Sequence, residues 1–418
     1  MSSPHHIVVI GGGAVGLCSA HYLRLEGHGV TVLETGRAGQ RCSLHNAGLI
    51  VPSHVVPLAS PGIIGKGVRW MMRRDSPFYL KPRLNPSFLR WAWLFRRSSS
   101  QDVSARSMLV LQSLFAAGSG LFEQLAQEDG MAFGLEHRGL LMLSRTEKGR
   151  RALEEEAELA RRMNVACELL DTPALAALQP HTPFREVSAV HYPDDAHLSP
   201  ALLVEQLKSL VLRQGVRIRE GVRFLGWERG GSGVAAVRTG EGTFRADTFV
   251  LAGGAWSGAL ARRLALRLPL EAGKGYSLTQ PVPEWRGTMP LLLTEDRVAV
   301  TPLDGHIRFA GTMEIAGLDE KISAHRLRAI ARAVPRYLEI PEPRLDGELW
   351  SGLRPCSPDG LPYIGRFAEA PNLIAATGHA MLGITLAPVT GRLVADIIAR
   401  RPAPVELAPL SPDRFGLR

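Results

Sequence analysis

One glycine-rich segment near the amino terminus restricts the fold more than any other part of the chain. The apolar residues 7–10 are followed by Gly11, Gly13 and Gly16, which match the pattern G-x-G-x-x-G. A continuous apolar run of this kind predicts a buried parallel strand. The first glycine permits a tight turn, the second lets the backbone approach a pyrophosphate, and the third lets the next helix pack closely. The segment therefore predicts a β-α-β unit that binds a dinucleotide.

The residues after the glycines fit this unit. A helical pattern covers residues 17–26, and a second apolar run covers residues 30–33. That run ends at Glu34, roughly 20 residues beyond the first glycine, where an acid can accept hydrogen bonds from a ribose. An acid there argues against a cofactor with a 2′-phosphate. FAD and NAD both use such a unit, so it leaves the choice between them open.

Three later segments could complete the dinucleotide site. Residues 41–49, with the sequence RCSLHNAGL, could bring side chains and backbone close to a flat ligand, or could form a surface turn. Residues 249–258 repeat the pattern of a buried strand that ends in two glycines. Residues 373–400 combine a strand, a loop and a helix, and the helix is expected to begin near Ile384 and Thr385.

Together these motifs resemble the FAD-dependent oxidoreductases of the D-amino acid oxidase type. Within that family the chain is most similar to the small subunit of bacterial D-amino acid dehydrogenases. The motifs that carry the resemblance are residues 11–16, Glu34, and residues 43–48, 274–279, 352–355, 358–360, 377–379 and 382–383. The resemblance implies FAD without NAD. The FAD is expected to be non-covalent, because Ala380 and Met381 stand where covalently flavinylated members have a cysteine.

The resemblance also implies which residues contact FAD, and no metal is expected. The expected contacts are Gly11, Gly13, Ala14, Val15, Gly16, Glu34, Ser43, Asn46, Ala47, Gly48, Leu49, Val222, Gly253, Gly254, Gly383, Ile384 and Thr385. Val222 is expected to meet the adenine through its backbone. The amides at the start of the last helix carry partial positive charge, which suits the N1–C2=O edge of a reduced flavin.

The predicted fold class is α/β, an α+β two-domain flavoprotein. A chain of 418 residues is too long for one ordinary core. The resemblance implies a discontinuous, Rossmann-like FAD-binding domain made of residues 1–49, 199–267 and 346–418. Residues 50–198 and 268–345 would form a substrate domain built on a mostly antiparallel sheet.

The expected chemistry needs a group that fixes the substrate carboxylate. Flavin oxidation of an amino acid moves the α-hydrogen to N5 as a hydride, and a planar guanidinium can bind the carboxylate through two hydrogen bonds. Arg354, in a loop stiffened by proline and glycine, is the first candidate, and Arg308 is the second. Tyr276 could add a hydroxyl or be a half-buried strand residue. His379 could contact substrate or be a hydrogen-bonded bystander, and no obligatory protein base is assigned.

Residues 63–97 bear on the electron acceptor, which could be oxygen or an external carrier. They contain nine Lys and Arg residues, seven aromatic residues and one acid, Asp75, while the whole chain has a formal net charge of +9. Basic residues mixed with Trp and Phe suit a segment on an anionic membrane surface, near a quinone. Alternatively, the aromatic residues belong to the core. No signal peptide is recognised, and no apolar run approaches the ~20 residues of a membrane span, so a cytoplasmic protein is expected.

Three functions remain open at this stage. The first is a D-amino acid dehydrogenase that passes electrons to the respiratory chain, with D-proline or cis-4-hydroxy-D-proline as alternative substrates. The second is an oxidase of the same substrates that makes hydrogen peroxide. The third is a flavoprotein that modifies a nucleoside in RNA, suggested by a pI near 9.8. Because the positive charge is concentrated in one aromatic stretch, no nucleic acid partner is expected.

Overall fold

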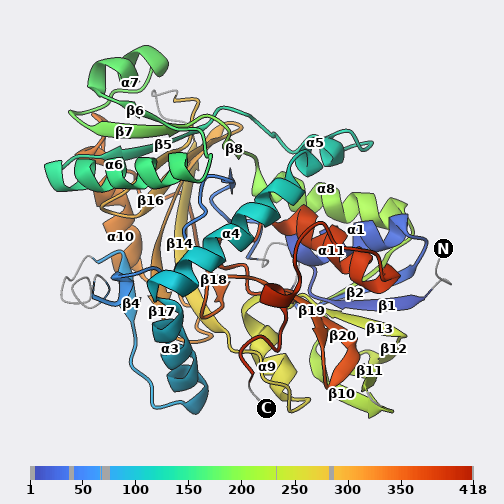
Figure 1. The fold of residues 1–418 in the computed structure, drawn as a ribbon. Coiled ribbons are helices and arrows are strands. Elements are labelled where there is room, and N and C mark those ends of the chain that lie inside the picture. Colours follow the sequence, from blue (N-terminus) through green and yellow to red (C-terminus); the bar gives the residue numbers. More distant parts are fainter. Residues whose placement is uncertain are drawn as a thin grey trace.

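The chain is organised around two main sheets, which lie in the left and right parts of Figure 1. The structure is a computed structural model that describes residues 5–36, 42–65, 67, 76–231, 233–281 and 287–416. Figure 1 places the first and last segments of the chain around the smaller sheet, and α4 (Gln101–Gly118) runs between the two parts.

The smaller sheet is the predicted dinucleotide-binding unit. Among the described residues it has six strands in the order β19 (Tyr363–Phe367), β20 (Ala370–Thr377), β13 (Thr248–Leu251), β1 (His6–Ile10), β2 (Gly29–Glu34) and β9 (Arg217–Glu220). All neighbouring pairs are parallel except β19 and β20. Strand β1 is buried at every position after its first residue, as its apolar sequence predicts. The Rossmann-like α/β fold is thus confirmed.

Two layers cover this sheet. One face packs on α1 (Ala14–Leu25), α8 (Pro200–Arg213) and α11 (Ala387–Ala399), whose side chains share a core with Ile7 and Val9. The other face packs on a three-stranded sheet of β10 (Phe224–Gly230), β11 (Gly233–Thr239) and β12 (Gly242–Arg245). The helices α1 and α11 lie so close that a β-carbon at Gly391 would come within 2.6 Å of the Cys18 backbone.

The larger sheet is mostly antiparallel. Its described strands are, in order, β18 (Glu348–Cys356), β14 (Glu271–Pro281), β17 (His306–Ile315), β16 (Val298–Leu303), β15 (Leu291–Leu293), β5 (Leu140–Ser144), β7 (Ser188–Tyr192) and β6 (Glu168–Leu170), and β4 (Phe78–Leu80) pairs with β17. One face packs on α10 (Ala324–Ala333). The other carries α6 (Glu147–Arg162) over β5 and β7. The remaining described α-helices and strands are α3 (Pro86–Ser98), α5 (Leu121–Ala126), α7 (Thr172–Leu178), α9 (Ser257–Arg262), β3 (Leu49–Ile50) and β8 (Ala196–His197).

The division into two domains stays a prediction. Two elements, β18 and α4, pack with the sheet of the domain to which they were not assigned. Residues 346–418 were assigned to the FAD-binding domain, yet β18 pairs along its whole length with β14 of the larger sheet. Residues 50–198 were assigned to the substrate domain, yet Leu111 and Leu114 of α4 belong to the core of the smaller sheet. Both differences arise from pairing and packing between segments that are distant in sequence, which local motifs do not reveal.

The basic aromatic segment is only partly described. The predicted basic and aromatic residues Lys66, Arg69, Trp70, Arg73 and Arg74 lie outside the described residues. The rest includes α3 (Pro86–Ser98), which Asn85 caps by accepting a hydrogen bond from the Ser87 amide. Phe88 and Trp91 are buried core residues, and the Trp91 indole donates to the Cys356 carbonyl at 2.9 Å. No helix in the described part of the chain is long and apolar enough to cross a membrane.

Candidate active site

The glycine turn and the start of α1 fit a pyrophosphate. Gly11 has a φ of +113°, and a β-carbon there would overlap the Ala252 carbonyl. A β-carbon at Gly16 would overlap the Gly11 carbonyl, so both positions require glycine. The first turn of α1 contains no acidic residue and Gly13 makes no side-chain cap, so the amides of Ala14 and Val15 face no competing anion on their own helix.

Glu34 is fixed at the carboxyl end of β2. Its Oε2 accepts from the Gly12 amide at 2.6 Å and its Oε1 accepts from the Gly36 amide at 2.7 Å. A carboxylate has about four acceptor sites, so the side chain can still accept from ribose hydroxyls. The Val222 amide donates to the Glu34 carbonyl at 2.9 Å. The structure therefore brings the predicted ribose and adenine contacts together.

The 42–48 loop joins this nucleotide end to the larger sheet. The Ala14 amide donates to the Ser43 hydroxyl at 3.2 Å, and the Gly48 amide donates to the Asn46 side chain at 2.9 Å. Gly48 has a φ of +80°, and a β-carbon there would overlap the Leu198 carbonyl. Ala47 lies between these two hydrogen-bonded residues. The loop is thus held in one conformation from both ends.

The carboxyl-terminal elements meet the same loop. The Thr385 hydroxyl donates to the Leu49 carbonyl at 3.2 Å, and the Thr377 hydroxyl donates to the Gly254 carbonyl at 3.0 Å. Gly253 precedes the short helical turn η1 (Gly254–Trp256) at the end of β13.

The last helix begins later than predicted. It was expected near Ile384 and Thr385, but α11 begins at Ala387, and Gly383, Ile384 and Thr385 form turns before it. Pro388 explains the difference, because proline lacks an amide hydrogen and is tolerated only in the first turn of a helix.

Arg354 was expected in a loop, but it lies within β18, where it pairs with Gly273 of β14, on the face of the larger sheet that carries the 42–48 loop. Its guanidinium occupies the space that a β-carbon at Gly275 would fill, and Gly275 pairs with Gly352 on the neighbouring strand. Nη1 donates to the Thr312 carbonyl at 2.8 Å. Burial lowers the pKa of Arg354, and nearby Cys42 and Cys356 oppose this shift. No ion pair joins Arg354 to a carboxylate within the described ranges, so no carboxylate of that part of the chain engages its five donors.

Arg308 lies under the 42–48 loop. Its Nη1 donates to the Leu44 and Asn46 carbonyls at 3.2 and 2.8 Å, and its Nε donates to the Thr279 hydroxyl at 3.0 Å. The side chain is 4% exposed, and burial lowers its pKa to about 10. These contacts make Arg308 a support for the loop and leave Arg354 as the arginine suited to a carboxylate.

Two other predicted residues do not join Arg354. Successive residues of a strand point to opposite faces, so Tyr276 points away from the face to which Gly275 and Arg354 belong. Its hydroxyl donates to Glu314 at 3.0 Å. His379 is buried, with its Nε2 2.9 Å from the Thr390 hydroxyl, and burial lowers its pKa to about 3. His379 is therefore neutral and fits the bystander alternative.

Trp350 was missed by the sequence reasoning. A β-carbon at Gly352 would overlap the benzo ring of Trp350, so the indole lies against this glycine. Gly352 pairs with Gly275, against which the Arg354 guanidinium lies, so the two groups are neighbours. The His45 ring stacks on Trp350 with centroids 5.0 Å apart. A usable signal was the alternation of Trp350, Gly352 and Arg354, which places all three on one face of a strand.

Asp195 was also missed. It is fully buried and accepts from the Ser53 amide at 3.1 Å and from the Ser53 hydroxyl at 2.6 Å. That hydroxyl lies 3.1 Å from Nδ1 of His54. Burial raises the pKa of Asp195 to about 7 and lowers the pKa of His54 to about 4. The cluster fixes the segment that follows β3 against the end of β7.

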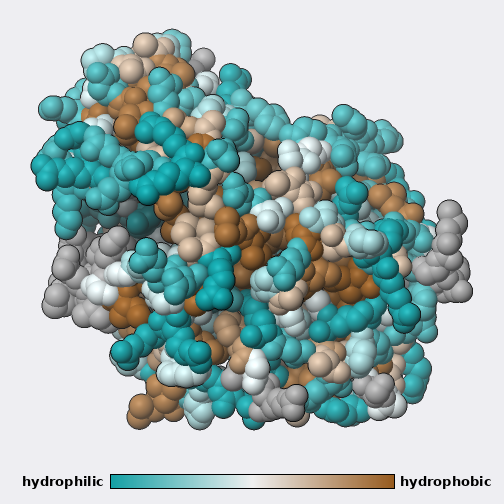
Figure 2. Space-filling model, in the orientation of Figure 1, coloured by the Kyte–Doolittle hydropathy of each residue, from teal (hydrophilic) through white to brown (hydrophobic). Residues whose placement is uncertain are grey.

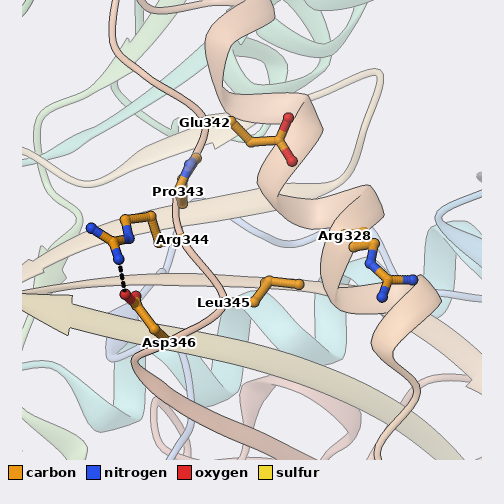
Figure 3. Close-up of a pocket in the computed structure, with 6 residues that line it drawn as sticks. All are labelled: Arg328, Glu342, Pro343, Arg344, Leu345 and Asp346. Carbon is orange, nitrogen blue, oxygen red and sulfur yellow. Dashed lines mark ion pairs between the residues drawn. The ribbon is translucent and has the colours of Figure 1, made fainter.

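Neither a metal site nor the groove beside α10 competes with this site in the described part of the chain. Among the described residues, no group of three or more His, Cys, Asp or Glu could hold a metal ion. Figure 3 shows a groove beside α10 in which Arg344 pairs with Asp346 at 2.7 Å, while Arg328 points away from this pair. The groove is lined by Arg328, Glu342, Pro343, Arg344, Leu345 and Asp346. None of the predicted site residues belongs to it.

Comparisons with known proteins agree with the motifs and the fold. The family model described as FAD dependent oxidoreductase matches residues 6–397. The D-amino acid dehydrogenase of Methylobacterium radiotolerans is 33% identical over 98% of this chain and 100% of that protein. Glycine oxidase from Geobacillus kaustophilus has a TM-score of 0.77 at 24% identity, covering 98% of both chains. L-proline dehydrogenase from P. horikoshii has a TM-score of 0.75 at 19% identity, covering 100% of this chain and 99% of that one. These two likenesses support the fold alone.

The buried Asp195 makes a prediction about stability and pH. Its pKa is raised by folding, from 3.8 to about 7. Its contribution to stability is therefore fully present below pH 3.8 and is lost as the pH rises through 7. The shift corresponds to at most about 4 kcal/mol. Asp195→Asn cannot ionise, so its melting temperature relative to wild type should rise between pH 5 and 8.5. The exposed Asp304→Asn is the control, and parallel curves for Asp195→Asn and wild type would contradict the prediction.

Proposed function

The chain belongs to the family of FAD-dependent oxidoreductases, and on this basis we propose that it is a D-amino acid dehydrogenase. The relative from M. radiotolerans has this activity in its name and matches the chain over nearly its full length. The observation that carries the proposal is the half-buried guanidinium of Arg354. It lies near Cys42 of the 42–48 loop and has no carboxylate partner in the described part of the chain. Partial desolvation of a charge that has no carboxylate partner is unfavourable, which favours an anionic ligand at this position.

FAD supplies the ring that accepts the hydride when it is bound. Glu34 would accept from its ribose, and the Val15 amide at the start of α1 would face its pyrophosphate, beside the Ala14 amide that donates to Ser43. The loop around Asn46 and the turn around Gly383 would hold the flavin end. The two are connected, because the Thr385 hydroxyl, two residues after Gly383, donates to the Leu49 carbonyl at the end of that loop. Backbone amides in that turn would stabilise negative charge on the N1–C2=O side.

The substrate would be oriented by its carboxylate. A bidentate bond to Arg354 fixes the carboxylate plane and with it the direction of the α-hydrogen. His379 is neutral and bound to Thr390, so it is given no role as a base. An amino acid that arrives with a neutral amine needs no proton acceptor from the protein for the hydride step.

A cyclic imino acid such as D-proline or cis-4-hydroxy-D-proline is the second candidate substrate. One observation favours it. The indole of Trp350 lies against Gly352, beside the guanidinium of Arg354. A flat aromatic surface next to the carboxylate site suits the apolar edge of a pyrrolidine ring.

The electron acceptor is proposed to be a carrier at an anionic membrane surface, contacted through α3 and the turn before it. Leu84 is 98% exposed, and Leu89 and Trp93 are each 52% exposed. The exposed Arg96 and Arg97 lie on the same helix. Figure 2 shows apolar surface at the lower edge of the molecule, where Figure 1 draws the turn between β4 and α3. Exposed apolar and basic side chains on one helix suit an anionic lipid surface.

The first test is an anaerobic reduction of the flavin. D- and L-amino acids, D-proline and the hydroxyproline isomers are added singly to the holoenzyme, and the oxidised flavin band near ~450 nm is followed. One D-compound should bleach the band rapidly. Oxygen is then admitted, and slow recovery that an artificial electron acceptor accelerates identifies a dehydrogenase. If none of these compounds bleaches the flavin, the amino acid assignment is wrong.

Arg354→Lys tests the carboxylate site. A lysine keeps the charge but loses the planar fork, so the substrate KM should rise by about 10- to 100-fold, equivalent to about 1.4–2.8 kcal/mol. The FAD content should not change. Arg344→Lys, in an exposed ion pair, is the control. An unchanged KM in Arg354→Lys would remove Arg354 from the substrate site.

Vesicle binding tests the membrane contact. Wild type should sediment with anionic vesicles and stay in solution with neutral phosphatidylcholine vesicles. Each basic residue near such a surface contributes about 1 kcal/mol, so Arg96→Gln/Arg97→Gln should weaken binding about 30-fold. Arg151→Gln/Arg162→Gln on α6 removes two exposed arginines elsewhere. Equal loss in both double variants, or no binding by wild type, would rule out a contact through α3.

A further inference from the structure

Lys274 and Tyr276 belong to the motif at residues 274–279, yet neither side chain lies on the substrate face, which is the face of the larger sheet that contains Arg354. The Lys274 side chain is 3% exposed, and its Nζ donates to Asp319 at 3.0 Å and to the Lys321 carbonyl at 3.2 Å. The same Nζ lies 3.7 Å from Oε1 of Glu314, whose Oε2 accepts from the Tyr276 hydroxyl. Both motif residues therefore converge on one carboxylate of the neighbouring strand.

Glu314 lies immediately after an irregularity in β17. Lys274 pairs with Glu314 and Tyr276 pairs with Gly311, so two residues of β17, Thr312 and Met313, stand opposite the single Gly275. This is a β-bulge, which re-aims the backbone groups of the bulged strand. Thr312 has a φ of +68°. A β-branched residue in this region is strained and persists only where its surroundings hold it.

Contacts from Arg326 and from the segment that includes β4 hold the bulge in place. On the carboxyl-terminal side, Arg326 lies 3.7 Å from Glu314 and donates to the Ser76 carbonyl at 2.9 Å. The Met313 amide donates to the Pro77 carbonyl at 2.8 Å, where β4 joins β17. Glu314 is thus tied to two cations and one hydroxyl, and these contacts fix the strand that contains Thr312.

The bulge acts on the substrate face through one carbonyl. The Thr312 oxygen accepts from Nη1 of Arg354 at 2.8 Å. We propose that Lys274, Tyr276 and Glu314 are positioning residues, which orient the Arg354 guanidinium through the Thr312 bulge. The inference rests on the proposed function in one respect, namely that a substrate carboxylate is the ligand of Arg354.

Tyr276→Phe is the main test, because it removes one hydroxyl without changing the shape of the core. The chain provides a matched control in Tyr337→Phe. Tyr337 is equally buried in the same core, and its hydroxyl donates to Glu295 at 2.6 Å and to Asp296 at 3.1 Å. Both variants lose a buried tyrosine–carboxylate hydrogen bond, but only Tyr276 connects to Arg354. A purely structural role would affect the two variants alike.

The measurements use the holoenzyme. The Kd of benzoate, a carboxylate with no α-hydrogen to transfer, is determined from the change it causes in the flavin spectrum, beside the KM and kcat of the substrate. Tyr276→Phe should weaken benzoate binding and raise the KM by about fivefold or more, with a smaller effect on kcat and none on FAD content. Tyr337→Phe should leave both binding constants unchanged. Glu314→Gln should act in the same direction as Tyr276→Phe and replaces it if that variant does not fold.

A double variant shows whether Tyr276 acts through Arg354. Adding Tyr276→Phe to Arg354→Lys should cost little further affinity, because the group that Tyr276 positions is already lost. Additive effects, or equal effects of Tyr276→Phe and Tyr337→Phe, would overturn the positioning role alone. If wild type binds benzoate as weakly as Arg354→Lys does, the carboxylate assignment fails for both proposals.

Discussion

The guanidinium of Arg354 depends on two glycines that face each other across β14 and β18. At Gly275 a β-carbon would overlap the guanidinium itself, and at Gly352 it would overlap the indole of Trp350. The absence of two side chains therefore creates the space in which a charged and an aromatic group lie flat against the sheet. Because β18 contributes to the larger sheet, the arginine is held by backbone hydrogen bonds on a rigid strand. The backbone of Arg354 is thus fixed by the sheet, and the Thr312 carbonyl orients its side chain.

The two parts of the molecule are joined by the segment that follows the nucleotide-binding unit. Ser43 contacts the start of α1, while Arg308 of the larger sheet holds the carbonyls of Leu44 and Asn46. Leu49 pairs with His197, so the same segment reaches the region before α8. FAD bound at α1 would therefore meet a loop whose position is set by the larger sheet. A small number of hydrogen bonds thus sets the position of the 42–48 loop between the start of α1 and the larger sheet.

The sequence was most informative where a structure is determined by neighbouring residues. The glycine turn at Gly11 is local, because the requirement for a positive φ and a close backbone approach arises within a few residues of the motif. The FAD-binding motif and its acid could be read in the same way. The start of α11 was misjudged by a few residues, since Pro388 fits the first turn of a helix rather than its second.

Side-chain direction on the larger sheet could not be predicted, because it depends on pairing between strands that are far apart in sequence. Tyr276 and Arg354 belong to motifs that were assigned to one site, yet the alternation along β14 places Tyr276 on the opposite face. The bulge at Thr312 breaks the pairing with β17 and cannot be inferred from a threonine in an ordinary strand sequence. The role of Arg308 was hidden for the same reason, as its partners lie in a loop more than 250 residues away.

Lys274, which is buried, and Arg354, which is half-buried, are two cations on opposite faces of one sheet, and they differ in how their charge is balanced. Lys274 lies between the carboxylates of Asp319 and Glu314, so its charge is compensated within the protein. Arg354 has only a backbone carbonyl among the described groups, so the carboxylate of the proposed substrate would compensate its charge. The same strand pair thus carries one cation that stabilises the fold and one that the fold keeps available. Because Glu314 lies beside the bulge that contacts Arg354, the compensated cation also fixes the geometry of the uncompensated one.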